Sequence, residues 1–167
     1  MKLADVEAIL RSLNDANVRY LIVGGLAVVA HGYVRATVDL HIVLQLKGAN
    51  ALKAMQALKE IGYEPLIPVD AADFADEKKR QVWRDEKHMI VFQMRHPRPE
   101  STRLDIFVEE PFSFDEEYKR AFWDTVANVR APFLRYDELI RLKRASGRPQ
   151  DLADIAELEL IEKNRKA

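Results

Sequence analysis

The sequence predicts an α/β (α+β) fold, in which helices flank a mixed sheet and a helical extension follows at the C-terminus. Three observations support this prediction. Helical and strand-like hydrophobic patterns alternate along the chain, later strands follow one another closely, and the C-terminal segment is helical. The length of 167 residues fits one domain. We therefore expect a core over residues 1–134 and C-terminal helices over 135–167, packed on the core in one compact unit.

The elements of the first half follow in a clear order. Apolar residues at helical spacing predict a helix over 3–13, and a short apolar run predicts a buried strand over 20–23. Gly24 and Gly25 break this strand, and residues 26–31 are expected to form a short helix. Strict alternation over 38–46 predicts a second strand with Asp39 and His41 on one face. A helix is expected over 52–61.

The second half continues this alternation of elements. Residues 64–86 are irregular to helical in character, and apolar runs predict strands over 89–94 and 103–108. The second of these strands places Arg103 and Asp105 on one face. A short helix is expected over 115–123, one more strand within 124–132, and two final helices over 136–145 and 151–163.

Composition excludes several classes of protein and of site. The chain has 26 basic and 27 acidic residues, a balance that argues against a dedicated DNA-binding protein. It has no cysteine, so disulfides, thiolate zinc sites and a cysteine nucleophile are excluded. The first residues lack the apolar core of a signal peptide, and the apolar runs are too short to span a bilayer. We expect a cytoplasmic protein without membrane contact.

An ordered set of residues points to phosphate chemistry. Gly24 and Gly25 lie between a strand and a helix, where backbone N–H groups are available to phosphates. Asp39 follows on the next predicted strand and Asp105 on a later one, and carboxylates are the ligands that Mg²⁺ prefers. Residues i and i+2 of a strand share a face, roughly 6.5–7 Å apart. The partner of Asp39 at this spacing is His41 rather than a second acid.

Two groups of residues, far apart in the chain, carry a family resemblance. The first group is Val23-Gly24-Gly25-Leu26-Ala27, His31-Gly32, Arg35, Thr37 and Asp39-Leu40-His41. The second group is Leu142-Lys143, Ala145, Gly147-Arg148, Asp151 and Asp154-Ile155. Together they resemble bacterial minimal nucleotidyltransferases of the polymerase-beta-like superfamily, in the branch of the abortive-infection (AbiEii-type) toxin nucleotidyltransferases. The resemblance implies a nucleotidyltransferase fold.

The resemblance also implies roles for individual residues. Asp39 and Asp105 would be the catalytic residues. They would hold a divalent metal, Mg²⁺ or Mn²⁺, together with position 41, where His41 replaces the second carboxylate of the family pattern. The nucleotide-binding residues that it implies are Gly24, Gly25, Arg35, Thr37, Lys143 and Arg148.

Two functions remain open from the sequence. An active protein would bind a nucleoside triphosphate and transfer its nucleoside monophosphate to a hydroxyl on a protein or an RNA. A pseudoenzyme with the same fold would act as a binding or regulatory partner in a toxin–antitoxin or defence system, and His41 favours this alternative. Purely structural roles are open for the same residues. Arg35 or Arg103 would pair with Asp39 in a salt bridge, and Gly24 and Gly25 would only form a turn.

Overall fold

The computed structural model describes residues 1–166, and its centre is a mixed sheet. The strands are β1 (Tyr20–Val23), β2 (Leu40–Leu44), β3 (Glu64–Pro65), β4 (Val91–Arg95), β5 (Leu104–Phe107), β6 (Phe122–Val126) and β7 (Val129–Phe133). They lie in the order β3-β4-β5-β2-β1-β7-β6. The pairs β2–β5 and β1–β7 are parallel, and the other neighbours are antiparallel. The predicted mixed α/β fold is confirmed.

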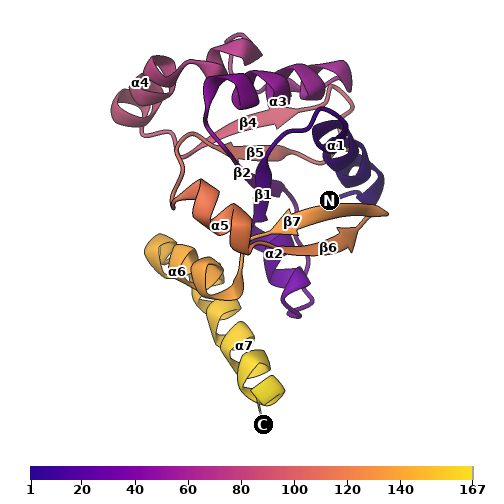
Figure 1. Cartoon of the computed structure of the whole chain (residues 1–167), viewed down its shortest axis with the longest axis vertical. Helices are drawn as coiled ribbons and strands as arrows, with labels where there is room; N and C mark the ends of the chain where they lie inside the picture. Colours follow the sequence, from indigo (N-terminus) through magenta and orange to yellow (C-terminus); the bar gives the residue numbers. More distant parts are fainter. Residues whose placement is uncertain (167) are drawn as a thin grey trace.

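Helices surround this sheet (Figure 1). They are α1 (Leu3–Asp15), α2 (Gly24–Ala30), α3 (Gly48–Glu60), α4 (Glu77–Lys87), α5 (Phe114–Arg120), α6 (Tyr136–Ser146) and α7 (Pro149–Lys166), with a 3-10 turn, η1 (Ala71–Ala75). Helices α1 and α3 lie side by side, and the Ser12 hydroxyl of α1 donates to the Ala57 carbonyl of α3 at 2.9 Å. No helix within residues 1–166 combines the length and apolarity needed to cross a membrane.

The core is built from both faces of the sheet. All four residues of β1 are buried, and β2 is buried at every position except His41. One stripe of α1, namely Val6, Ile9, Leu10 and Leu13, is fully buried. This spacing is the reason why the segment forms a helix against the sheet, since residues three and four apart share one helical face.

The structure corrects the expected elements around residue 120. The predicted helix over 115–123 ends at Arg120, and Phe122 and Trp123 already belong to β6. Two strands, β6 and β7, form where one was expected. The reason is tertiary: Phe122 lies opposite Phe133 in the register, and their rings stack at 5.3 Å, a cross-strand pair that favours strand over helix.

The C-terminal helices contact the core at α2 and the loop that follows it. Arg35 of this loop pairs with Asp154 of α7 at 2.6 Å. A Cβ at Gly32 would lie 2.9 Å from Arg165 and 3.6 Å from Ile161, both on α7. Helix α7, yellow in Figure 1, therefore contacts this loop from Asp154 to Arg165.

Candidate functional site

The turn at the end of β1 is built for close approach. Gly24 has φ +65°, and a Cβ there would lie 3.0 Å from the Cβ of His41. A Cβ at Gly25 would lie 2.4 Å from Thr37 Oγ1 and 3.3 Å from an Arg35 nitrogen. Both positions therefore require glycine, for the left-handed backbone at the first and for space at the second. The glycines bring Arg35, Thr37 and His41 against the start of α2.

His41 and Asp105 form a pair across the centre of the sheet. The parallel register of β2 and β5 sets them opposite each other, and His41 Nε2 lies 3.2 Å from Asp105 Oδ2. On the other side of Asp105, Gln93 of β4 donates to Oδ1 at 3.2 Å. Both oxygens of this buried carboxylate are thus engaged. Among the residues described, His41 Nδ1 is buried without a partner, and it lies 3.3 Å from where a Gly24 Cβ would be.

Asp39 forms the adjacent pair on the same face. It directly precedes β2, two residues before His41, and its Oδ1 accepts a hydrogen bond from Arg103 Nε at 3.1 Å. Arg103 lies two residues before Asp105, so the two pairs follow one another at strand spacing. The sheet therefore brings Asp39, His41 and Asp105 together on one face, beside the Gly24-Gly25 turn.

The remaining implied residues meet in a second cluster, which we call the ion network: Arg35, Lys143, Arg148, Asp151 and Asp154. Arg35 holds Asp154 through two hydrogen bonds of 2.6 and 2.8 Å. Lys143 donates to Asp154 at 2.6 Å and to Asp151 at 3.0 Å, and Arg148 pairs with Asp151 at 2.7 Å. Arg35 belongs to the first sequence group and the other four to the second, so this network joins the two groups.

Burial and charge oppose each other at the two acids of the ion network. Burial alone would raise the pKa of Asp151, but hydrogen bonds from Arg148 and Lys143 outweigh it and lower the pKa to about 2. The same balance lowers the pKa of Asp154, where burial is outweighed by hydrogen bonds from Arg35 and Lys143. Both carboxylates are therefore held ionised.

The donors on the sheet face do not fit a pair of Mg²⁺ ions. Within residues 1–166, no three His, Cys, Asp or Glu side chains are grouped so that they would hold a metal ion. Asp105 is bonded on both oxygens and Asp39 is paired with Arg103. Two divalent ions a few ångströms apart also need anionic ligands, and the imidazole of His41 brings no negative charge.

Three solved structures share this architecture. The lincosamide antibiotic adenylyltransferase LnuA, in a lincomycin-bound structure, matches with a TM-score of 0.59 at 19% identity, over 95% of this chain and 96% of that one. ANT(2″)-Ia, in complex with adenylyl-2″-tobramycin, matches with a TM-score of 0.57 at 12% identity, over 99% of this chain and 98% of that one. An antigenic nucleotidyltransferase-like protein from Paracoccidioides brasiliensis matches with a TM-score of 0.53 at 18% identity, over 93% of this chain and 74% of that one. The chain has a nucleotidyltransferase fold.

At these identities the likeness concerns the fold alone. No protein-family model matches the sequence, and no curated protein does. The abortive-infection branch and the residue roles implied by it therefore stay predictions.

On this nucleotidyltransferase fold, sequence reasoning missed the contact between Gln93 and Asp105. Gln93 holds Asp105, and its only signal is that it is the polar residue of an apolar run, MIVFQM over 89–94. His31, one of the residues of the first sequence group, has a structural contact. It lies at the end of α2 with Nε2 2.9 Å from the Leu134 carbonyl, and burial lowers its pKa.

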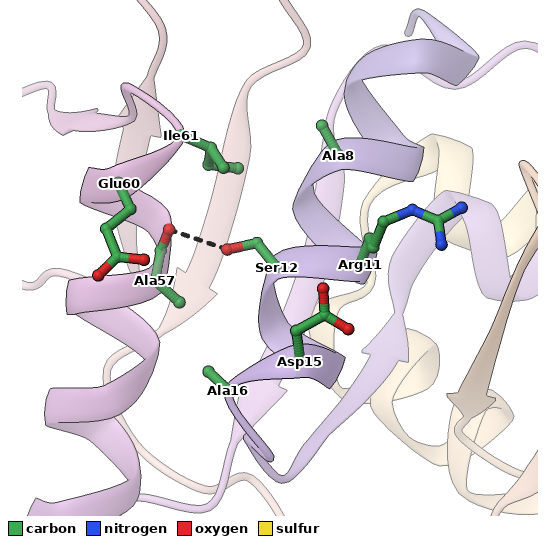
Figure 2. Close-up of a pocket in the computed structure, with 8 residues that line it drawn as sticks. All are labelled: Ala8, Arg11, Ser12, Asp15, Ala16, Ala57, Glu60 and Ile61. Carbon is green, nitrogen blue, oxygen red and sulfur yellow. Dashed lines mark hydrogen bonds between the residues drawn. The ribbon is translucent and has the colours of Figure 1, made fainter.

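A groove elsewhere on the surface holds none of the implied site residues. Figure 2 shows it between α1 and α3, where Ala8, Ser12 and Ala57 are small enough to leave a hollow. Arg11 of α1 stands at its edge and pairs with Glu7 at 2.8 Å. The groove results from the packing of two helices with small side chains. The candidate functional site is therefore the sheet face beside Gly24 and not this groove.

Proposed function

We propose that this chain is a nucleotidyltransferase-like protein that binds a nucleoside triphosphate on the sheet face beside the Gly24-Gly25 turn. One observation carries the proposal: Asp39, His41 and Asp105 share one face of the sheet at the place where the turn comes closest to it. The backbone at the turn, with Thr37 against it, offers N–H and hydroxyl donors to phosphate oxygens, and Arg35, held by Asp154, lies beside it.

The reaction class that belongs to this proposal is transfer of a nucleoside monophosphate to a hydroxyl. Asp39 or Asp105 would accept the proton of that hydroxyl as it attacks the α-phosphate, and pyrophosphate would leave. The acceptor hydroxyl lies on a protein or an RNA. The structures of LnuA with lincomycin and of ANT(2″)-Ia with adenylyl-2″-tobramycin add small molecules as a third acceptor class to be tested.

A specific observation favours the second candidate, a binding or regulatory protein with little turnover. Nucleotidyl transfer of this kind relies on Mg²⁺ or Mn²⁺ to neutralise the developing charge. The hydrogen bond from Gln93 and the imidazole of His41, 3.2 Å away, occupy the Asp105 carboxylate, and no second acid is present at position 41. We therefore expect nucleotide binding with weak or absent Mg²⁺-dependent transfer, and a cognate protein as the partner through which such a chain would act.

Two measurements test this proposal. The first is calorimetry with ATP, GTP, CTP and UTP in turn. Binding of at least one is expected, and no binding of any at millimolar concentration would contradict the proposal. The second uses α-³²P-labelled nucleotides with cell extract, total RNA, lincomycin or tobramycin as acceptors. Label on an acceptor identifies an active transferase, whereas binding without label identifies the binding protein.

A further inference from the structure

A row of four charged residues lies on the face that carries His41 and Asp105, two of them in β3 and β4 and two directly before β5 and β2. In the register of β3 and β4, Glu64 lies opposite Arg95, with an ion pair of 3.4 Å. Gln93 lies opposite Asp105, and the same antiparallel register continued by two residues sets Arg95 opposite Arg103. Arg103 in turn binds Asp39 at 3.1 Å. We call these four residues the arginine row, with the acids at its ends and two arginines at its centre.

The centre of the arginine row brings together two like charges, each paired with an acid on its outer side. Like charges directly opposite each other on neighbouring strands are destabilising. Arg95 and Arg103 each turn Nε to the acid on their outer side, at 3.4 and 3.1 Å. Among residues 1–166, their terminal nitrogens have no hydrogen-bond acceptor, and both side chains are about half exposed. An anion between them would remove the repulsion and use the free donors.

The chemistry of these donors selects phosphate. Guanidinium groups bind phosphate oxygens through paired hydrogen bonds, and two of them side by side suit a chain of phosphates. In the row next to it on this face, Gln93 donates to one oxygen of Asp105, and His41 Nε2 lies 3.2 Å from the other. Arg95 and Arg103 each offset one acid of the row, Glu64 and Asp39, and still have terminal N–H groups that can donate to phosphate oxygens.

We propose that Arg95 and Arg103 bind the triphosphate of the nucleotide directly, so that this protein holds its nucleotide without a divalent cation. The inference rests on the proposed function, because it assumes that a nucleoside triphosphate binds on this face. It adds that the terminal N–H groups of the two guanidinium groups hold the phosphate oxygens that metal ions would otherwise hold.

Calorimetry in two buffers tests the inference. ATP, GTP, CTP and UTP are each titrated into the protein with MgCl₂ and again with EDTA. For the nucleotide that binds, we expect the two affinities to agree within about threefold. Arg103→Ala and Arg95→Ala should each weaken binding about tenfold or more, since each removes a charged hydrogen-bond donor. Circular dichroism and thermal unfolding of each variant check that it is folded.

Arg11→Ala is the matched control. Arg11 is also about half exposed and paired with one carboxylate, but it lies on α1 at the groove of Figure 2. We expect its variant to bind nucleotide as the wild type does. Sodium tripolyphosphate should compete with the nucleotide in EDTA, because the phosphates are the recognised part.

The outcomes separate the inference from the proposed function. Binding in MgCl₂ that disappears in EDTA would overturn the inference and leave nucleotide binding standing. Equal binding by the wild type and the two arginine variants would overturn it as well. No binding in either buffer would overturn both. A direct measurement needs no nucleotide: electron paramagnetic resonance of Mn²⁺ added to the protein should show only the free ion, and a bound-ion spectrum would count against the inference.

Discussion

The ion network and the arginine row are both charged, and they differ in how far their donors are used. In the ion network, Lys143 is 5% exposed and its ammonium group meets two carboxylates, both of them buried. In the arginine row, Arg95 and Arg103 are half exposed and keep their terminal nitrogens free of the residues described. A cluster with satisfied donors holds structure together, whereas one with spare donors is suited to binding.

This contrast changes what the resemblance implies for Lys143. A basic helix residue is expected to be solvated or to reach for phosphate, but here its charge is enclosed between α6 and α7. The ion network fastens these helices to Arg35, which lies against Gly25. Its influence on the nucleotide would therefore pass through the position of Arg35. The predictions below test this division, in order of decreasing effect on stability.

The largest loss of stability is expected for Lys143→Met. The substitution keeps the length of the side chain and leaves Asp151 and Asp154 buried with less positive charge. We expect the free energy of unfolding to fall by about 3 kcal/mol, the lower end of the range for breaking a buried ion pair, because the arginines remain. Urea unfolding measures this change. Lys59→Met, at an exposed position of α3, should stay within about 0.5 kcal/mol of wild type.

The pH dependence of the ion network is the next effect in size. Asp151 has a folded pKa of about 2, lowered from 3.8, so its stabilisation is complete above the unfolded value and is lost as pH falls toward 2. A shift of this size corresponds to about 2 kcal/mol. Asp151→Asn should be less stable than wild type at neutral pH, and the difference should shrink between about pH 4 and pH 2.

Urea unfolding at a series of pH values checks this prediction. Asp15→Asn, at an exposed residue of α1 without an ion pair within residues 1–166, serves as the control and should run parallel to wild type. A difference between Asp151→Asn and wild type that stays constant down to pH 2 would show that the carboxylate does not depend on its charge.

A smaller effect is expected at the turn. In Gly25→Ala the added Cβ would meet Thr37 Oγ1 at 2.4 Å and Thr37 Cβ at 2.9 Å, so one of the two residues must move. We expect a loss of about 1–2 kcal/mol from this overpacking. Adding Thr37→Ala should recover part of it, which a double-mutant cycle measures. Gly48→Ala, whose Cβ would have its nearest contact at 3.8 Å, should not destabilise the protein.

The sequence predicted these two regions unequally, for a physical reason. Strand parity over 38–46 set Asp39 and His41 on one face, because alternation is a local property of the chain. The pairing of His41 with Asp105 depends on the register between β2 and β5, which no local pattern determines. The burial of Lys143 was also hidden, since a helix face rich in basic residues is typical of a solvated surface until α7 covers it.

The smallest change in stability, and the clearest change in chemistry, is expected for His41→Asp. The site is partly exposed, so the lost contact between His41 and Asp105 and the repulsion between two opposed carboxylates should together cost about 1 kcal/mol in unfolding free energy. The new carboxylate would face Asp105 and add negative charge next to Asp39. This should create affinity for divalent cations and raise Mg²⁺-dependent label transfer above wild type. Metal-free nucleotide binding should weaken, since the added charge repels the triphosphate.

Two measurements on His41→Asp therefore move in opposite directions. Mn²⁺ binding, followed by electron paramagnetic resonance, should appear, while nucleotide affinity in EDTA should fall. His41→Asn is the matched control, because it shortens the side chain in the same way without adding charge, and it should gain no Mn²⁺ binding. If the wild type transfers nucleotide efficiently with Mg²⁺ and His41→Asp leaves the rate unchanged, then His41 does not limit the site. The second anionic ligand of the metal would then come from another side chain. That side chain would belong to the binding cluster, and the arginine row alone would no longer describe the nucleotide site.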